Sequence, residues 1–322
     1  MSLFDWFEQR VDPFPPQEVT RPPETLFAFC VHYTQGFWPW LIFVAFLTAA
    51  IAIMQVLVFG FLGEVVDWLA TANRETFFQD EFWSLFWMGA VVIVLLPVAG
   101  ALHTLIMHQV LFGNHPMRIR WRAHRFMLGQ SFGFYQDEFA GRVATKVMQT
   151  ALGVRETVAK ILDVLVYVGV YFGGALILVG SLDWAMMVPF LGWLVLYSAL
   201  LYRYLPKMRE ISEIQSNARS TMTGRIVDSY TNIMTVKLFA HSRSEQDYAK
   251  ESMTQFLGTV YPQMRIGSKL NIGLDLVNSA LLFSVGLIGL LSWQAGGASV
   301  GAIAVGVGLV MRLEGLSAIR NP

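Results

Sequence analysis

The lysines and glycines of this chain are spaced in a way that excludes one common chemistry. The chain has six lysines, and none of them follows a glycine. A phosphate-binding loop needs Gly-Lys-Ser/Thr, because backbone N–H groups and the lysine together hold the phosphates of a nucleotide. The run GAIAVGVG at 301–308 has dinucleotide-like glycines, but it lies in an apolar stretch where close helix packing explains them better. We therefore predict that this chain alone does not hydrolyse ATP.

Histidine and cysteine are not spaced like the ligands of a metal site. His103 and His108 are five positions apart, whereas a spacing of four would place two ligands on one helix face. Cys30 is the only cysteine, which excludes an intramolecular disulfide framework and a cysteine-based zinc site. No HExxH motif occurs. We therefore expect neither a bound metal nor an intrinsic catalytic centre.

The composition is that of a membrane protein. Hydrophobic residues make up 55 % of the chain and charged residues 14 %, and the charged share is about half that of a soluble domain. Lipid must therefore cover the excess apolar surface. Lysine plus arginine equals aspartate plus glutamate at 23 each, which argues against a nucleic-acid partner bound by bulk positive charge.

Several uncharged stretches are long enough to cross a bilayer. A hydrocarbon core of roughly 30 Å needs about 20 apolar helical residues. The uncharged stretch 276–311 is too long for one span, and the Gly-rich segment 294–301 divides it. We predict an all-α membrane protein with six transmembrane helices at about 38–62, 82–110, 163–182, 184–203, 271–293 and 298–318.

Basic residues gather on one side of the predicted spans. The loop 113–160 holds eight lysines and arginines and the loop 203–269 holds ten, whereas the loop 64–81 holds one. Because cytoplasmic loops carry an excess of basic residues, the two long loops should be cytoplasmic. With six spans, both termini lie on the same side.

The first 37 residues should form a cytoplasmic arm that ends in a short helix, before a membrane domain over 38–322. The stretch Pro22 to Trp40 opens with a proline pair and mixes aromatic with polar residues. This pattern indicates an elbow helix in the membrane interface, with Phe37 and Trp38 at headgroup level. An aromatic belt at the start of the first span explains the composition equally well.

The two long loops keep helical periodicity. Apolar residues recur at helical spacing among the charges, as at Ile226, Ile233 and Val236. Helical hairpins of this length would reach about 35 to 45 Å beyond the membrane. Two such arms indicate either a partner to be gripped or two helical subdomains without a partner, and periodicity does not separate these interpretations.

Two segments in these loops carry a family resemblance. FYQDEFAGRVATKV, at 134–147, resembles the first intracellular loop of ABC exporters of the multidrug and lipid-flippase type. RIVDSYTNIMTVKLFAHSRSEQDY, at 225–248, resembles their second intracellular loop. Six spans with long loops after the second and fourth also fit that family. The chain departs from the family pattern at Thr150, where Asp is frequent, and at Asn232, where Gly is frequent.

The resemblance implies a coupling helix at the tip of each long loop, near 136–144 and 229–236. In the family these helices sit in grooves of ATP-binding domains and transmit their closure to the spans. For the first helix the implied residues are Gln136, Asp137, Phe139, Gly141 and Arg142. For the second they are Ser229, Tyr230, Thr231, Asn232 and Ile233.

The implied partners are a nucleotide-binding domain, fused or separate, and a second transmembrane half that completes a homodimer or heterodimer. ATP and Mg would bind to that nucleotide-binding domain and not to this chain. We expect the chain to be a fragment or domain of a longer protein, and the alternative is a natural stand-alone permease subunit. Its location would be the bacterial inner membrane.

Polar residues within the predicted spans are candidate cavity residues. In the resembled family the sixth span lines the central cavity, so Arg312 and Glu314 could contact substrate, as could Asn278 in the fifth span. A structural ion pair or an interfacial position explains Arg312 and Glu314 as well. The predicted function is export of a hydrophobic or amphipathic substrate by alternating access, and the alternative is an ATP-independent six-span channel or secondary transporter.

Overall fold

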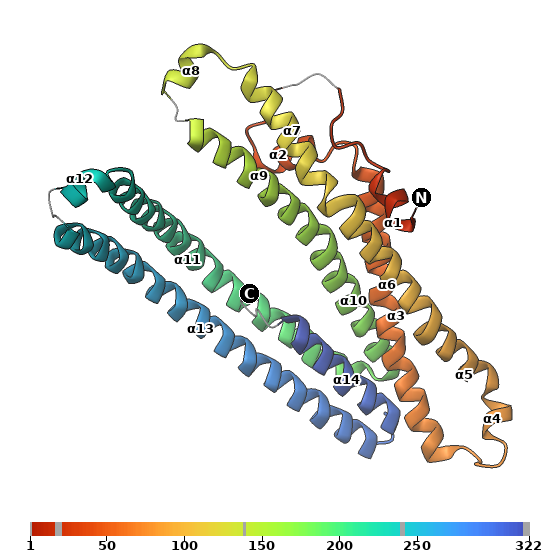
Figure 1. Cartoon of the computed structure of the whole chain (residues 1–322). Coiled ribbons are helices and arrows are strands. Elements are labelled where there is room, and N and C mark those ends of the chain that lie inside the picture. Colours follow the sequence, from red (N-terminus) through yellow and green to blue (C-terminus); the bar gives the residue numbers. More distant parts are fainter. Residues whose placement is uncertain (1, 17–20, 138–139, 239–241, 318–322) are drawn as a thin grey trace. The chain divides into compact units, whose positions relative to one another are not determined.

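The computed structural model describes residues 2–16, 21–137, 140–238 and 242–317, and within these ranges every regular element is helical (Figure 1). The chain divides into two compact units, Met1–Leu178 and Val179–Pro322. Each unit is described by itself below. The all-α fold class predicted from the sequence is confirmed.

The first unit begins with short helices and continues into long apolar ones. Its N-terminal helices are α1 (Leu3–Glu8), α2 (Leu26–Tyr33), α3 (Trp38–Thr71) and α4 (Phe77–Asp80). The next run is continuous apart from Gly113 and consists of α5 (Phe82–Gly89), η1 (Ala90–Leu95), α6 (Leu96–Leu105), η2 (Ile106–Phe112) and α7 (Asn114–Leu128). The returning run is α8 (Phe132–Asp137), α9 (Ala140–Lys160), η3 (Ile161–Leu165) and α10 (Val166–Leu182), which crosses into the second unit. The three η segments are π-helical, so their turns are wider than those of the flanking α-helices.

The second unit is built on two very long helices that run side by side (Figure 1). They are α11 (Trp184–Thr231) and α13 (Ser242–Gln294), with α12 (Ile233–Leu238) between them and α14 (Val300–Ser317) after them. Asp183 starts α11, because its side chain accepts a hydrogen bond from Ala185 N at 2.9 Å. Prolines interrupt the backbone hydrogen bonding inside both long helices, at Pro189, Pro206 and Pro262.

The apolar stretches lie within these helices as the sequence predicts. In the described part of the chain, five helices are long and apolar enough to cross a membrane: Trp38–Thr71, Phe82–Leu128, Lys146–Leu182, Trp184–Thr231 and Ser244–Gln294. The sixth predicted span coincides with α14, which reaches Ser317 at the edge of the described residues. The helices extend well beyond the predicted spans, because their polar continuations keep the same helical periodicity.

Polar side chains also connect the apolar helices of the first unit. Asp163 accepts a hydrogen bond from Thr48 Oγ1 at 3.0 Å, and its carboxylate lies 3.0 Å from Nε2 of His103. His103, whose spacing from His108 argues against a metal site, thus contacts Asp163, and Thr48 bonds to the same oxygen, Oδ1. The phenol of Tyr167 similarly donates to Gln55. These contacts join α3 to α6, η3 and α10 within otherwise apolar surfaces.

Contacts of α2 and the α2–α3 turn with α7 form a second polar group, which we call the elbow brace. It consists of His32, Tyr33, Gly36 and Phe37 on one side and His115, Arg118 and Arg122 on the other. Arg122 donates to the carbonyl of His32 at 2.8 Å, and its Nη2 lies 2.9 Å from Nε2 of the same residue. Gly36 has φ +89°, and a Cβ there would lie 2.6 Å from Nη1 of Arg118. The elbow is thus a separate short helix, and Phe37 is fully buried beside His115.

Candidate functional site

The far end of the α11–α13 hairpin carries the clearest candidate site. With 48 residues, α11 is about 72 Å long at 1.5 Å per residue, so roughly 42 Å remains after a 30 Å bilayer core has been crossed. Asn232 is the C-cap of α11. Its N–H still makes the last helical bond, to Asp228 O at 3.0 Å, but its own backbone angles are no longer helical. The stretch predicted as one coupling helix, 229–236, is therefore divided between the last turn of α11 and α12.

A pocket of about 340 Å³ lies at this end, where α11, α12 and α13 meet. We call it the tip pocket. Its lining is mostly apolar and comprises Ile226, Ser229, Tyr230, Ile233, Val236, Glu245, Gln246, Ala249 and Met253. Tyr230 is 70 % exposed, and Met234 and Leu238 on α12 are more than 70 % exposed as well. An open apolar pocket rimmed by exposed aromatic and aliphatic side chains is typical of a surface that another protein covers.

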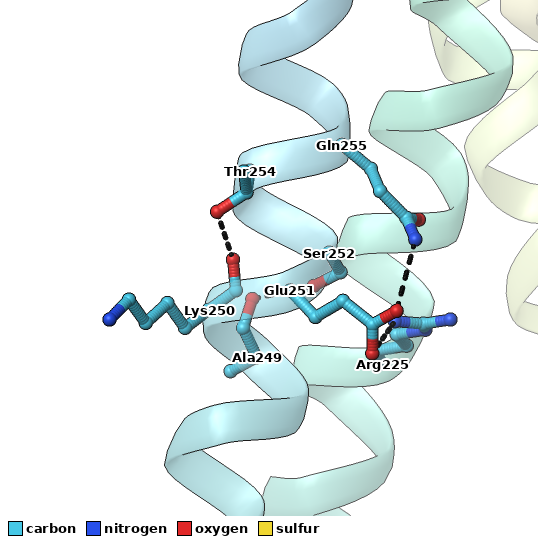
Figure 2. A network of polar contacts seen from close by, with 7 residues as sticks. All are labelled: Arg225, Ala249, Lys250, Glu251, Ser252, Thr254 and Gln255. Carbon is cyan, nitrogen blue, oxygen red and sulfur yellow. Dashed lines mark hydrogen bonds and ion pairs between the residues drawn. The ribbon is translucent and has the colours of Figure 1, made fainter.

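Polar contacts that begin in the wall of the tip pocket hold α11 against α13, and we call this group the hairpin clamp. Ser229 Oγ donates to Glu245 at 2.6 Å. One helical turn further from the tip, the Arg225 guanidinium lies 4.4 Å from the centre of the Tyr248 ring and Nη1 lies 3.9 Å from Glu251. Figure 2 shows Arg225 and Gln255 converging on the carboxylate of Glu251, to which the Gln255 amide donates at 3.3 Å. A displacement of the tip must therefore move both helices together.

The first predicted coupling helix lies at the α8–α9 turn of the first unit. Gln136 and Asp137 end α8, and Gly141 and Arg142 belong to the first turn of α9. Phe139 lies outside the described residues. Next to this segment, Tyr135 donates its phenol hydrogen to Met127 O at 2.6 Å, which ties α8 back onto α7.

The expectation from the sequence that no GxSxG motif occurs is wrong for the same region. Residues 129–133 read GQSFG, the GxSxG pattern of serine hydrolases. That pattern acts where a strand turns into a helix, whereas here it connects α7 to α8 and Ser131 is exposed. The motif therefore runs from the turn after α7 into the first residues of α8 and does not have the strand-to-helix geometry of a nucleophile.

The candidate cavity residues occupy different environments in the second unit. Asn278 is buried in α13 and accepts a hydrogen bond from the Trp193 indole of α11 at 2.8 Å. Arg312 and Glu314 are both exposed on α14. The buried amide therefore fastens α11 to α13, while the two charged residues face away from the interior of the unit.

Histidines of the elbow brace are held neutral by their surroundings. Burial, together with the charges of Arg118 and Arg155, lowers the pKa of His115 to about 4. Burial and the neighbouring Arg122 also lower the pKa of His32. Among the residues that the structure describes, no group of three or more His, Cys, Asp or Glu side chains could hold a metal ion.

Long apolar helices that continue into paired helices outside the bilayer define a multi-pass helical membrane domain with a lever-like extension. Residues 40–313 match the family described as "ABC transporter transmembrane region". The chain therefore belongs to that family and is the transmembrane part of an ABC transporter. A curated protein of Haemophilus influenzae, named "Uncharacterized ABC transporter ATP-binding protein", is 42 % identical over 316 residues, which is 98 % of this chain and 51 % of the relative. The chain thus spans about half the length of that relative.

Proposed function

We propose that this chain is the transmembrane half of an ATP-driven exporter that moves a hydrophobic or amphipathic substrate by alternating access. Nucleotide-binding domains would bind ATP and Mg and press on the two hairpin ends, and a second transmembrane half would complete the pathway. The name of the Haemophilus influenzae relative, which includes "ATP-binding protein", supports an ATP-binding part outside the region covered here.

The observation that carries this proposal is the tip pocket at the end of a clamped hairpin. The helix pair can transmit a push along its axis, because α11 and α13 are each continuous from the hairpin end into the apolar part of the chain. Tyr230 would anchor the partner, since a largely exposed aromatic at the rim of an apolar pocket gains most from being covered. A channel would have no need for such a docking end.

Substitution of Tyr230 in the full-length protein tests the proposal. Tyr230→Ala should lower transport and substrate-stimulated ATP hydrolysis together, while membrane expression and substrate affinity stay near the unmodified level. The matched control is Tyr261→Ala, because Tyr261 is also exposed but lies roughly 24 Å along α13 from the level of Glu245. Normal transport by Tyr230→Ala, with Phe139→Ala equally silent, would contradict both the coupling role and the exporter mechanism.

The proposed orientation places both hairpin ends and both termini in the cytoplasm of a bacterial cell. The basic loops support this, since they carry eighteen of the lysines and arginines. After replacement of Cys30, a cysteine introduced at Arg142 or Lys237 should resist a membrane-impermeant maleimide in intact cells and react in inside-out vesicles. Reaction in intact cells would reverse the orientation.

The proposed substrate path includes Asn278, Arg312 and Glu314. The exposed position of Arg312 and Glu314 on α14 supports this role, because a charged side chain at the surface of its own unit can be reached by a substrate or by the second half. Arg312→Gln should change the preference among charged substrates without changing ATP hydrolysis in the absence of substrate. An unchanged substrate preference would contradict the proposal that Arg312 on α14 lines the substrate path.

A further inference from the structure

We propose that the N-terminal helix α1 is a membrane anchor whose exposed apolar face inserts into the inner part of the adjoining lipid leaflet. This inference is independent of the exporter mechanism, because it requires only that the chain be an integral membrane protein. It also changes the expected role of the N-terminal arm, which the sequence analysis assigned to the aqueous side.

The local sequence makes α1 a defined helix despite its six residues. Ser2 and Asp5 form a reciprocal capping box, with Asp5 N donating to Ser2 Oγ at 3.1 Å and Ser2 N donating to Asp5 Oδ2 at 2.7 Å. At the other end, the Asn114 amide donates to Glu8 O at 2.9 Å. Both ends of α1 are therefore held by hydrogen bonds, so the same side chains always point toward the protein and the same ones away from it.

One face of α1 is packed against the apolar helices. Phe7 and Val11 are buried in a cluster with Phe37 and Leu41 of the α3 entrance and with Val110 of η2. By contrast, α2 packs against Ile119 and Val154, beyond the apolar stretch. Ile119 follows Val110 by nine residues, so Phe7 packs nearer to the apolar stretch than α2 does.

Three apolar side chains that flank Phe7 on α1 stay exposed in the part of the chain that the structure describes. Leu3 is 62 % exposed, Phe4 52 % and Trp6 45 %. Three large apolar side chains within four positions would be unfavourable in water. Because η2 belongs to an apolar stretch that must contact lipid, a face fixed beside it is continuous with the lipid-facing surface. Lipid is therefore the occupant that the position of α1 favours.

The boundary of this face matches a membrane interface. The guanidinium of Arg10 lies 3.5 Å from the centre of the Trp6 ring, which places a cation beside an aromatic residue that prefers headgroup level. Glu8 and Gln9 follow the apolar residues directly and are exposed. The helix thus has an apolar end and a polar end, as expected of an interfacial anchor.

Depth-dependent quenching of a fluorescent label tests the anchor in the full-length protein. All native cysteines, including Cys30, are replaced, and single cysteines are introduced by Phe4→Cys and, as matched control, Glu8→Cys. Both variants are labelled with an environment-sensitive maleimide and placed in vesicles of phosphatidylethanolamine and phosphatidylglycerol. A second variant, Leu3→Cys, serves if Phe4→Cys does not fold.

The anchor predicts that a lipid nitroxide near the carbonyl end of the acyl chain removes roughly half or more of the emission at position 4, while aqueous iodide quenches position 8 more strongly. Efficient iodide quenching at position 4 would show a water-exposed helix and overturn the proposal. Protection of position 4 from both quenchers would show a protein partner, such as a second copy of the chain, and would overturn it as well.

Discussion

The two helical extensions of this chain are stabilised in different ways. In the first unit, α7 is held by residues from far along the sequence: α2 and the N-terminal segment pack on it, and His115, Arg118 and Arg122 are buried in those contacts. In the second unit, α11 and α13 are joined mainly to each other, and Gln215 and Ser252 are the polar residues buried in the described part of that extension.

This difference separates a braced extension from a free-standing one. Among the described residues of its own unit, the extended part of this helix pair is clamped mainly to itself, so the pair can move as one body. By contrast, α7 is hydrogen-bonded to α2, so α7 can move only if these bonds break or if α2 moves with it. We therefore expect substitutions in the elbow brace to reduce the stability of the first unit, and substitutions in the hairpin clamp to loosen the second hairpin with little effect on the fold.

The largest effect is expected from Gly36→Ala. The left-handed backbone at this position is unfavourable for alanine, and the new methyl group would displace the Arg118 guanidinium, for a combined cost of about 3 kcal/mol. The apparent Tm of the purified protein in detergent should fall. Gly113→Ala is the matched control, since a Cβ there meets no atom within 4 Å. Equal Tm values for the two variants would show that the brace contributes no stability.

Acidification should destabilise the first unit selectively. Because the pKa of His115 is about 4 in the folded protein and about 6.5 in an unfolded chain, the unfolded state binds the proton first as the pH falls. Stability is therefore fully present above about pH 6.5 and decreases toward pH 4, with about 2 kcal/mol lost by pH 5. Hydrogen–deuterium exchange at pH 7 and pH 5, corrected for the intrinsic rates, should show faster opening in α2 and α7. His115→Gln should remove most of this pH dependence; its persistence would assign it to another group.

Arg122→Met should cost about 2 kcal/mol, because it removes a charged donor from the His32 carbonyl while keeping the apolar stem. Faster hydrogen exchange is expected in α2, with the second unit unchanged. The matched control is Arg120→Met, an arginine two residues away on the same helix. Unchanged exchange in α2 after Arg122→Met would contradict the brace.

Ser229→Ala should weaken the hairpin clamp by about 1 kcal/mol, since Glu245 loses a short hydrogen bond. The expected result is faster exchange in the last turn of α11 and the first turns of α13, with the overall Tm preserved. Glu251→Gln should have a smaller effect, because its ion pair with Arg225 is long and its side chain is 62 % exposed. A larger effect from Glu251→Gln would reverse the assigned order of the two contacts.

The smallest change, and one of opposite sign, is expected for Gly224→Ala. Gly224 lies inside α11 in open space, so alanine should increase the helix stability by up to about 1 kcal/mol. Slower hydrogen exchange around this position would show that an added methyl group stabilises α11, whereas the same change at Gly36 destabilises the elbow brace. Destabilisation would indicate that another chain approaches this face of α11.

The sequence was sufficient to predict the helical class, the places of the apolar stretches and the helical nature of both long loops. Those features depend on local composition and on a period of 3.6 residues, which any single helix displays. The family resemblance also predicted the transmembrane region of an ABC transporter, which the match over residues 40–313 confirms. The orientation and the coupling roles remain predictions.

Contacts between distant residues could not be predicted in the same way. Nothing in the spacing of Arg122 and His32, which are 90 positions apart, indicates that they bond, and the His103–Asp163 contact depends on how three helices pack. The break at Asn232 was missed because no proline or glycine marks it. Asparagine is common where a helix ends, so Asn232 itself could have indicated the end of α11.

The prolines of the second unit have a mechanical consequence. Pro206 and Pro262 lie between the apolar stretches of α11 and α13 and the clamped end of the hairpin. Each removes a backbone hydrogen bond and crowds the preceding turn, so each helix has its lowest bending stiffness near that point. Under a sideways force at the tip, the hairpin would bend near Pro206 and Pro262, close to the membrane boundary. The part between these prolines and the tip would stay straight. The amplitude of tip motion is then set by where the prolines stand along each helix, and moving either one by a turn would change the length of the swinging arm.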